Sequence, residues 1–444
     1  MNDKQTGFFA RFMKSASNIE QNELRSVLLS FLFVFTLMSA WYILRPVRDA
    51  MASDWTDTEV AFLWNINLLV SAVVVAVYGV AVARVPFRYL VPGVYAFFAC
   101  SFVAYSFGVS GVDDRVLIDK IFYVWVSVFS LFHVSVFWSF MSDLFTKEQS
   151  NRLFAFIAVG STAGALVGPL IPALFADDLG TDKLMLIASF ALLVPIGLVL
   201  YLERLKSFDL SNEGVTADLS AARIGGNPFA GFKMFVTNPY LLAIGAFILL
   251  YTTIGSFVYF EQKNLLAEFS RAERTEILAM IDLIVNILPF LIGLFATSRI
   301  TKRFGMATTL ALVPLFIAAG LVILTFAPIL NVVLALQIAR RAGNYAITRP
   351  GREMLFTAVD RETRFKAKPV IDIVVYRGGD ALSSIAFAGL TDGLGFGLAA
   401  MAAIGAGIAA AWGAVGVYLG RMFSGRESAD AATMPNPKPA SQKA

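Results

Sequence analysis

The sequence has one cysteine and one histidine among 444 residues, and only 15% of its residues are charged. Cys100 has no second cysteine to pair with, which excludes a disulfide within the chain and a cysteine-based metal cluster. No histidine other than His133 is available for a Ser-His-Asp site. The chain also lacks a glycine loop ending in Gly-Lys-Ser or Gly-Lys-Thr, so it is not a pump driven by its own ATP hydrolysis. We therefore expect no enzyme activity, no cofactor and no metal.

Apolar residues dominate what is present: 57% of the chain is hydrophobic, and the mean hydropathy is +0.70. Runs near the roughly 20 residues that a helix needs to cross the hydrocarbon recur along the chain. They cover residues 26–45, 60–83, 89–109, 116–142, 154–175, 184–202, 240–260, 277–298, 306–326, 329–347, 370–390 and 395–423. Barrel strands need only about 9 to 11 residues and alternate in polarity. The sequence therefore predicts an all-α membrane protein with about twelve transmembrane helices.

Lysine and arginine are concentrated in alternate loops between these runs, and basic loops are retained on the cytoplasmic side. With a cytoplasmic N-terminus, the inner positions are Lys4, Arg11, Lys14, Arg84, Arg88, Lys147, Arg152, Arg204, Lys206, Arg223, Lys233, Arg299, Lys302 and Arg303. The opposite loops carry acids: Asp54, Asp57, Glu59, Asp113, Asp114, Asp177, Asp178 and Asp182. We expect both termini in the cytoplasm of a multi-pass protein of a bacterial-type inner membrane. The net charge of +4 reflects this loop bias and indicates no nucleic-acid partner.

The longest polar interruption lies near the middle of the chain, over residues 207–238, and contains Gly225, Gly226 and Pro228. A short basic turn follows both the second and the eighth run, which indicates a weak repeat. We predict a cytoplasmic N-terminal segment (1–25), a six-helix bundle (26–204), a cytoplasmic linker (205–238), a second six-helix bundle (239–423) and a disordered cytoplasmic tail (424–444). Two such bundles resemble the architecture of the major facilitator superfamily.

Small residues recur at four-residue spacing in the fifth run, at Gly160, Gly164 and Gly168, and the eleventh run contains Gly378, Gly379 and Gly389. Small residues with this spacing let two membrane helices approach closely. We therefore expect close helix contacts at both places.

Two arginines and an aspartate end the first run, at Arg45, Arg48 and Asp49. A charge inside a membrane span costs roughly 2.5 to 3.5 kcal/mol on insertion scales, so it usually faces a polar cavity and has a partner there. One interpretation is that these side chains reach the outer interface. The other is that they line a cavity, which is favoured because Pro46 is expected to break the helix there. The cluster then serves as a substrate or gating site.

Further polar residues lie inside later runs. In the eighth run Asp282 and Asn286 are four residues apart and share one helix face. Three interpretations are open: a structural contact with a neighbouring helix, a substrate contact, or a protonatable coupling site. The eleventh run places Asp372 near its inner end and then Arg377 and Asp380, three apart. Those two residues either pair with each other or help to recognise an anion.

Positive charge also marks the end of the tenth run, where Arg340 and Asn344 are one turn apart and are candidates to bind an anionic ligand. Glu261 and Lys263 follow an aromatic run at the far end of the seventh and are candidates for an outer gate. His133, midway along the fourth run, is interpreted either as a buried hydrogen-bonding group or as a proton carrier.

Two segments resemble a known family. Ile43-Leu44-Arg45-Pro46-Val47-Arg48-Asp49 is similar to the Ile-Leu-Arg-Asp-Thr-Lys-Asp signature of the ATP/ADP translocase family of nucleotide exchangers. The second segment is similar in order and spacing to three further motifs of that family, Pro-Thr-Lys-Glu-Met, Asp-Glu-Glu and Lys-Gly-Lys-Ala-Ala-Ile-Asp. The corresponding residues here are Arg349-Pro350-Gly351-Arg352-Glu353-Met354, Asp360-Arg361-Glu362 and Lys366-Ala367-Lys368-Pro369-Val370-Ile371-Asp372. The resemblance implies that Arg48, Arg352 and Lys368 match basic positions that help to bind nucleotide phosphates.

Together these patterns predict a secondary transporter that works by alternating access and moves a small anionic solute across the lipid bilayer. A nucleotide, exchanged in the ATP/ADP manner, or another phosphorylated or carboxylated metabolite is the expected substrate. Two alternatives stay open. One is a proton-coupled transporter for a neutral or cationic solute that uses Asp282 or Asp380 as its titrating group. The other is a membrane sensor that binds a ligand without moving it.

Overall fold

A computed structural model of the chain describes residues 19–108, 115–208, 210, 230–295, 297–359, 363, 367–368 and 370–433. These residues form helices joined by short connections, and no strand occurs among them. The predicted all-α class is confirmed. Residues 1–18 of the predicted N-terminal segment, the acids Asp113 and Asp114, and most of the polar interruption near the middle of the chain lie outside the described residues.

By its internal contacts the chain falls into two compact units. Unit 1 comprises residues 1–225 together with 263–287, and unit 2 comprises residues 226–262 together with 288–444. The segment 263–287, called the hairpin below, therefore belongs to unit 1 although it comes from the second half of the chain. The division into bundles, linker and tail stays a prediction.

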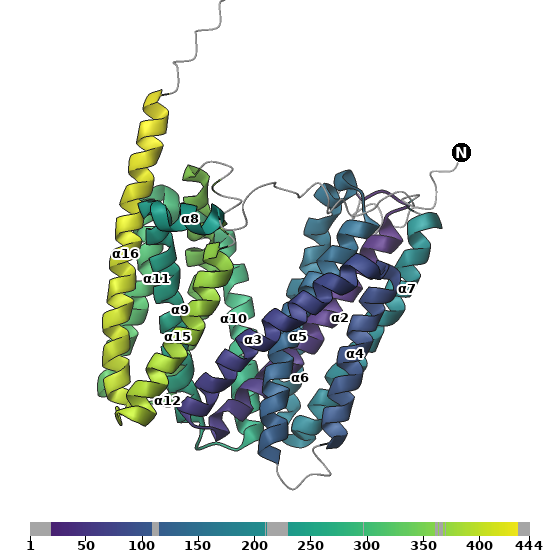
Figure 1. The fold of residues 1–444 in the computed structure, drawn as a ribbon, viewed down its shortest axis with the longest axis horizontal. Helices are drawn as coiled ribbons and strands as arrows, with labels where there is room; N and C mark the ends of the chain where they lie inside the picture. The colour runs from purple at the N-terminus through teal and green to yellow at the C-terminus, as the bar shows by residue number, and fades with distance from the viewer. Residues whose placement is uncertain are drawn as a thin grey trace, which may run out of the picture. The chain divides into compact units, whose positions relative to one another are not determined.

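Unit 1 is built from long helices that lie side by side (Figure 1). They are α2 (Leu24–Met51), the short η1 (Ala52–Asp54), α3 (Asp57–Arg84), α4 (Phe87–Gly108), α5 (Arg115–Leu144), α6 (Lys147–Ala191) and α7 (Leu193–Phe208). The hairpin belongs to the same unit. Capping boxes start α3 at Thr56 and α6 at Thr146, where each threonine accepts a hydrogen bond from the backbone of N3. Gly180, at φ 72°, divides α6 where the fifth predicted span gives way to the sixth.

The glycine stripe of α6 packs on α2, as its spacing predicts. A Cβ at Gly160 would come within 2.6 Å of the Phe31 carbonyl oxygen, and one at Gly168 within 2.7 Å of the Ser39 carbonyl oxygen. Gly164 meets the Phe35 carbonyl in the same way, and the Ser39 hydroxyl donates to the Gly164 carbonyl at 3.4 Å. Only residues without a side chain fit this crossing.

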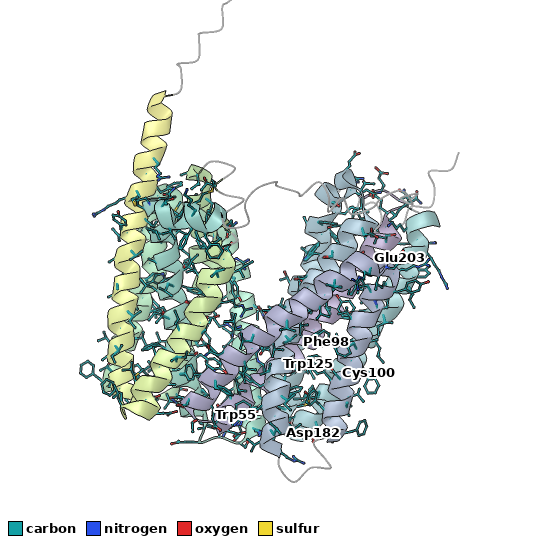
Figure 2. All side chains as sticks on the ribbon, in the orientation of Figure 1. Trp55, Phe98, Cys100, Trp125, Asp182 and Glu203 are labelled. Carbon is teal, nitrogen blue, oxygen red and sulfur yellow. The ribbon has the colours of Figure 1, made fainter. Side chains whose placement is uncertain are left out.

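Aromatic rings fill the space between α4 and α5. Phe98 contacts Trp125 at 5.4 Å between ring centroids and Phe129 at 5.0 Å. In Figure 2, Phe98 and Trp125 lie midway along unit 1, with Trp55 and Asp182 toward one end and Glu203 toward the other. The ends of unit 1 are named after Trp55 and Glu203 below.

Unit 2 combines long helices such as α16 with several short and interrupted ones (Figure 1). They are α8 (Ala230–Thr237), most of α9 (Pro239–Leu266), the end of α10 (Arg271–Phe295), α11 (Thr297–Phe326), α12 (Leu330–Gly343), η3 (Asn344–Thr348), α13 (Arg349–Leu355), η4 (Phe356–Ala358), η5 (Val370–Val375), α15 (Tyr376–Ala388), η6 (Gly389–Gly393) and α16 (Leu398–Thr433). Gly305, at φ 79°, breaks α11 near its start.

Close contacts also hold unit 2 together. Gly420 of α16 lies against Ala307 of α11, and Gly379 of α15 lies against Thr252 of α9. Beside that contact, the hydroxyls of Ser256 and Ser383 are hydrogen-bonded at 2.6 Å. Of the glycines predicted in the eleventh run, Gly379 makes the expected close approach, whereas Gly378 and Gly389 face open space.

Eight segments of the described chain are long and apolar enough to span a membrane, and one of them, Arg152–Lys206, has 55 residues and covers the fifth and sixth predicted spans. The predicted eighth, tenth and eleventh spans are not among the eight. The last two correspond to α12 with η3 and to η5 with α15, which are short helices joined to π-helical turns. π-helical turns inside helices are frequent at functional sites.

Two local expectations are wrong. The helix does not break at Pro46, because α2 continues to Met51. Proline removes one backbone hydrogen bond, and the buried packing of the neighbouring turns keeps the helix continuous. The last helix also extends past the predicted end at Phe423 to Thr433, so the first part of the expected disordered tail is helical. Its alanine-rich sequence favours a helix until Pro435.

Candidate functional site

The first polar cluster lies within unit 1, where α2 meets the hairpin. Arg45 Nη1 lies 3.1 Å from Asp282 Oδ1, and Arg45 Nε lies 3.8 Å from Asp49 Oδ2. The Asp282 side chain is only 4% exposed. An ion pair this deeply buried is retained only when the geometry offsets the loss of water from both charges.

Four side chains of the same cluster contact Arg48. Its Nε and Nη2 donate to Asp49 Oδ1 at 2.9 and 2.6 Å, and its Nη1 donates to Ser127 Oγ at 3.2 Å. The guanidinium also lies 5.6 Å from the Trp41 ring and 5.5 Å from the Tyr123 ring. The charges of Arg45 and Arg48 are therefore matched by those of Asp49 and Asp282.

Asn286 shares a helix face with Asp282, as predicted, and joins α2 to α6. Its Oδ1 accepts a hydrogen bond from the Tyr42 hydroxyl at 3.1 Å, and its Nδ2 donates to the Ala165 carbonyl at 2.9 Å. Both contacts use the amide to fix the hairpin on unit 1.

The hairpin is also held by ion pairs at the Trp55 end of unit 1. Lys263 Nζ lies 2.8 Å from Asp57 Oδ1 and donates to the Trp55 carbonyl at 2.6 Å. Both side chains of this pair are almost fully buried. The acids at this end are those of the loops that we predict to lie outside, so the predicted gate residue Lys263 has its partner there.

Two arginines of the hairpin extend this network. Arg274 Nη1 donates to Asp54 Oδ1 at 2.5 Å, and its other donors meet the carbonyls of Leu266 and Ala267. Arg271 contacts Asp54 at 2.7 Å and Asp119 at 2.6 Å. Together with the Lys263–Asp57 pair, three basic side chains face three acidic ones.

The second polar cluster lies within unit 2 and centres on Arg340, which is only 9% exposed. Its Nε and Nη2 donate to Gln337 Oε1 at 3.1 and 2.8 Å, and its guanidinium lies 5.9 Å from the Tyr251 ring. Among the described residues, no carboxylate lies within ion-pair distance of Arg340. Arg340 is thus a buried cation whose direct partner is neutral.

The other predicted residues of this cluster are arranged differently from Arg340. Asn344 begins the π-helical turn η3 and is partly exposed. Arg377 is exposed and forms no ion pair with the partly buried Asp380, although both are described. Of the two alternatives for Arg377 and Asp380, the mutual ion pair is therefore not formed.

A third cluster joins α13 to η5 in unit 2. Arg352 Nη2 lies 2.9 Å from Glu353 Oε1 and 3.5 Å from Asp372 Oδ1, and Lys368 Nζ lies 2.5 Å from Glu353 Oε2. Burial raises the pKa of Glu353, but hydrogen bonds from Lys368 and Arg352 lower it more, so its pKa lies below the ordinary 4.5. Asp360, Arg361, Glu362, Lys366 and Pro369 of the family-like segment lie outside the described residues.

His133, a candidate proton carrier, and Glu261, a candidate gate residue, are buried in the packing of their units. The His133 ring stacks on Trp41 at 5.1 Å, and its Nδ1 lies 2.9 Å from the Ser130 carbonyl. Glu261 is 1% exposed near the end of α9. A coupling role for either residue stays a prediction.

Sequence reasoning missed several of the contacting residues. Gln337 and Tyr251 are uncharged and lie in apolar runs, so charge alone did not mark them. The signal for Gln337 is its spacing, three residues before Arg340 on the same helix face. Arg271 and Arg274 precede the eighth run, and no local pattern pairs them with acids more than 150 residues earlier in the chain.

The comparisons with known proteins identify the class. The family model described as Major Facilitator Superfamily matches residues 28–347, and the chain belongs to this family. It is a family of transporters, which confirms the expectation that the chain is not an enzyme. None of the curated proteins compared with the chain matches it.

Solved structures of transporters share the fold. A bacterial homologue of the iron transporter ferroportin, inward-facing, is 13% identical over 90% of this chain and 100% of its own, with a TM-score of 0.64. The nucleoside transporter NupG is 14% identical over 92% of this chain and 99% of its own, at 0.61. A bacterial homologue of the human lysosomal transporter Spinster, inward-facing and unoccupied, is 14% identical over 94% and 100%, at 0.57.

The protein is therefore a multi-pass membrane transporter of the major facilitator type that moves a small solute. The structural matches establish its fold. Because the sequence identities are low, the solute is inferred from the chain's own residues.

Proposed function

We propose that the protein transports an anionic solute, either a nucleotide exchanged in the ATP/ADP manner or another phosphorylated or carboxylated metabolite. The observation that carries the proposal is Arg340, a buried guanidinium whose direct acceptor is the neutral Gln337. Burying a charge without an opposite charge is costly, and such a site gains stability when an anion binds.

The two units differ in a way that supports this role for Arg340. In unit 1 the arginines at residues 45 and 48 are already paired with Asp282 and Asp49. An anion that bound there would have to displace a carboxylate. In unit 2 an anion would meet a cation that no described carboxylate pairs with, so we assign the first anion contact to Arg340.

The resemblance of residues 43–49 and 349–372 to the ATP/ADP translocase family supports a nucleotide as the solute. Arg352 and Lys368, which match basic positions of that family, share Glu353 as a partner. We propose that these residues take part in nucleotide binding by exchanging this internal partner for a phosphate group.

The hairpin ion pairs are proposed as the gate at the Trp55 end, with Lys263 and its partner Asp57 buried at its centre. We also propose that this end faces outward and that both termini lie in the cytoplasm of a bacterial cell, because of the distribution of basic loops.

Transport by the purified protein in liposomes tests the substrate class. We expect uptake or exchange of labelled ATP, ADP or an organic anion such as succinate, and little uptake of adenosine, which lacks the phosphates of ADP. Uptake of adenosine together with no uptake of any anion would contradict the proposal. Liposomes without protein provide the background.

A second candidate function is proton-coupled transport of a neutral or cationic solute. Asp380 favours it, because this partly buried carboxylate forms no ion pair with Arg377, three residues before it. A pH gradient would then drive uptake of a neutral or cationic solute in the wild type and not in Asp380→Asn. Dependence of transport on Arg340 and on an anionic solute would decide against it.

A further inference from the structure

Arg340 presents its two hydrogen-bonding edges differently. Nε and Nη2 both donate to Gln337 Oε1, so the side edge of the guanidinium is occupied. No described residue accepts a hydrogen bond from Nη1. Nη1 and the second hydrogen of Nη2 form the end edge of the guanidinium, and both are available as donors to a ligand. Two parallel donors of this kind match the two oxygens of a carboxylate or phosphate.

The space beside Nη1 is kept open by a glycine. A Cβ at Gly255 would lie 3.1 Å from Arg340 Nη1 and 3.8 Å from its Cζ, and among the described residues outside this stretch of α9 no other atom would lie within 4 Å of it. Any side chain at residue 255 would therefore press on Nη1, one of the two donor groups of the end edge. Access to the guanidinium explains glycine at this position in α9, since Arg340 is the described residue that a Cβ here would meet.

The face of the guanidinium is fixed by an aromatic ring. The ring centroid of Tyr251, which lies one turn before Gly255 on α9, is 5.9 Å from Cζ of Arg340. Tyr251 also packs on Trp412 at 5.6 Å, which holds the ring in place. Gln337 on the side edge and Tyr251 on the face leave the end edge as the open approach to Arg340.

We propose that Gln337 and Gly255 shape an oxyanion subsite on the end edge of Arg340, which takes one carboxylate or phosphate group of the solute. Gln337 is the positioning residue. The amide oxygen of Gln337 orients the guanidinium as a carboxylate oxygen would. Because the amide is neutral, it does not neutralise the positive charge, which can then attract the ligand. Gly255 is the specificity-determining residue that leaves room for the anionic group. This inference rests on the proposed function and adds the geometry of the anion contact.

The exchange of Gln337 for glutamate tests the positioning role. Gln337→Glu keeps the size and the acceptor oxygen but supplies a negative charge, so the variant should fold at least as stably as the wild type and bind anions at least tenfold more weakly. Gln337→Leu removes the acceptor and keeps the positive charge, so it should weaken binding less than Gln337→Glu. A purely structural role for Gln337 predicts the opposite order.

The probes are ADP, inorganic phosphate and succinate, titrated against purified wild type and variants while the apparent Tm is followed, because a ligand of the native state raises Tm. A response to ADP and phosphate identifies a phosphate ligand, and a response to succinate alone identifies a carboxylate. Gly255→Ala should weaken binding of the responding probe at least threefold. Gly378→Ala is the matched control, because open space surrounds Gly378.

The outcomes separate the inference from the proposed function. If Arg340→Gln loses anion binding but Gln337→Glu and Gly255→Ala bind like the wild type, the subsite geometry is wrong and the proposed function stands. If Arg340→Gln binds the probes like the wild type, or if none of them binds the wild type, both are overturned.

Discussion

Arg45 is partly buried and Arg340 is buried, and their partners differ in charge: Asp282 for the first and Gln337 for the second. In a medium of low polarity this difference decides whether an arginine stabilises the fold or stays able to attract a ligand. The Arg45–Asp282 pair links α2 to the hairpin, and we therefore expect it to contribute mainly to stability.

The coupling between Arg45 and Asp282 should be measurable in a double-mutant cycle. Removing one partner of a buried ion pair leaves the other uncompensated and costs roughly 3 to 5 kcal/mol. Arg45→Gln and Asp282→Asn should each lower the apparent Tm in detergent clearly, and the double variant should lose much less than their sum. The control is the more exposed pair Lys120–Glu59, for which exposed-pair coupling of about 0 to 1 kcal/mol is expected. Strict additivity for Arg45 and Asp282 would contradict the ion pair.

Glu353 gives the third cluster a predictable pH dependence. Burial raises its pKa, but the hydrogen bonds from Lys368 and Arg352 bring it below 4.5. A carboxyl with a lowered pKa in the folded state stabilises the protein above its unfolded pKa, and this contribution is lost as the pH falls through the folded value. The Tm advantage of wild type over Glu353→Gln should therefore be present at pH 7, at about 1 to 2 °C, and shrink below pH 4.5. An advantage that grew on acidification would show that the ion pairs do not form.

Helices α2 and α6 cross where the glycine stripe removes side chains from the interface. A Cβ at Gly164 would meet the Phe35 carbonyl, which is backbone and cannot turn aside. Gly164→Ala should therefore destabilise unit 1 by roughly 1 to 3 kcal/mol and lower the apparent Tm. Gly197→Ala in α7 is the control, because its Cβ meets nothing within 4 Å and alanine favours a helix. Equal Tm values for the two variants would refute the close crossing.

The elements could be predicted from the sequence to different degrees. Apolar length located α2, α4 and α5, and four-residue spacing identified the glycine contact of α6, because both signals are local. The eighth, tenth and eleventh spans are polar or interrupted by π-helical turns, which apolar length does not reveal. The partners of Lys263 and Arg274 are set by tertiary packing, and the neutral partner of Arg340 left no signal in the charge pattern.

At the scale of the whole molecule, the proposed orientation makes a prediction for labelling in intact cells. In a Cys100→Ala background, which has no other cysteine, Glu268→Cys in the hairpin should react with a membrane-impermeant maleimide. Thr237→Cys at the end of α8 should react only after the membrane is permeabilised, because α8 belongs to the side that we propose to be cytoplasmic. The reverse pattern would invert the orientation.

Transport as a property of the whole molecule follows from the fold family, and the proposed solute class rests on one buried charge. The fold is shared with transporters of different solutes, among them a nucleoside transporter and a homologue of an iron transporter. Fold alone does not determine the solute. The proposed function of this protein therefore depends on whether the charge of Arg340 selects the solute.

The most direct measurement is the initial rate of anion uptake into proteoliposomes that contain wild type, Arg340→Gln or, as a control, Arg421→Gln, which changes an exposed arginine of α16. A charged hydrogen bond is worth about 1.5 to 3 kcal/mol, so Arg340→Gln should lower kcat/KM by roughly 10- to 100-fold. Arg421→Gln should transport like the wild type. Anion uptake by Arg340→Gln at the wild-type rate would contradict the account.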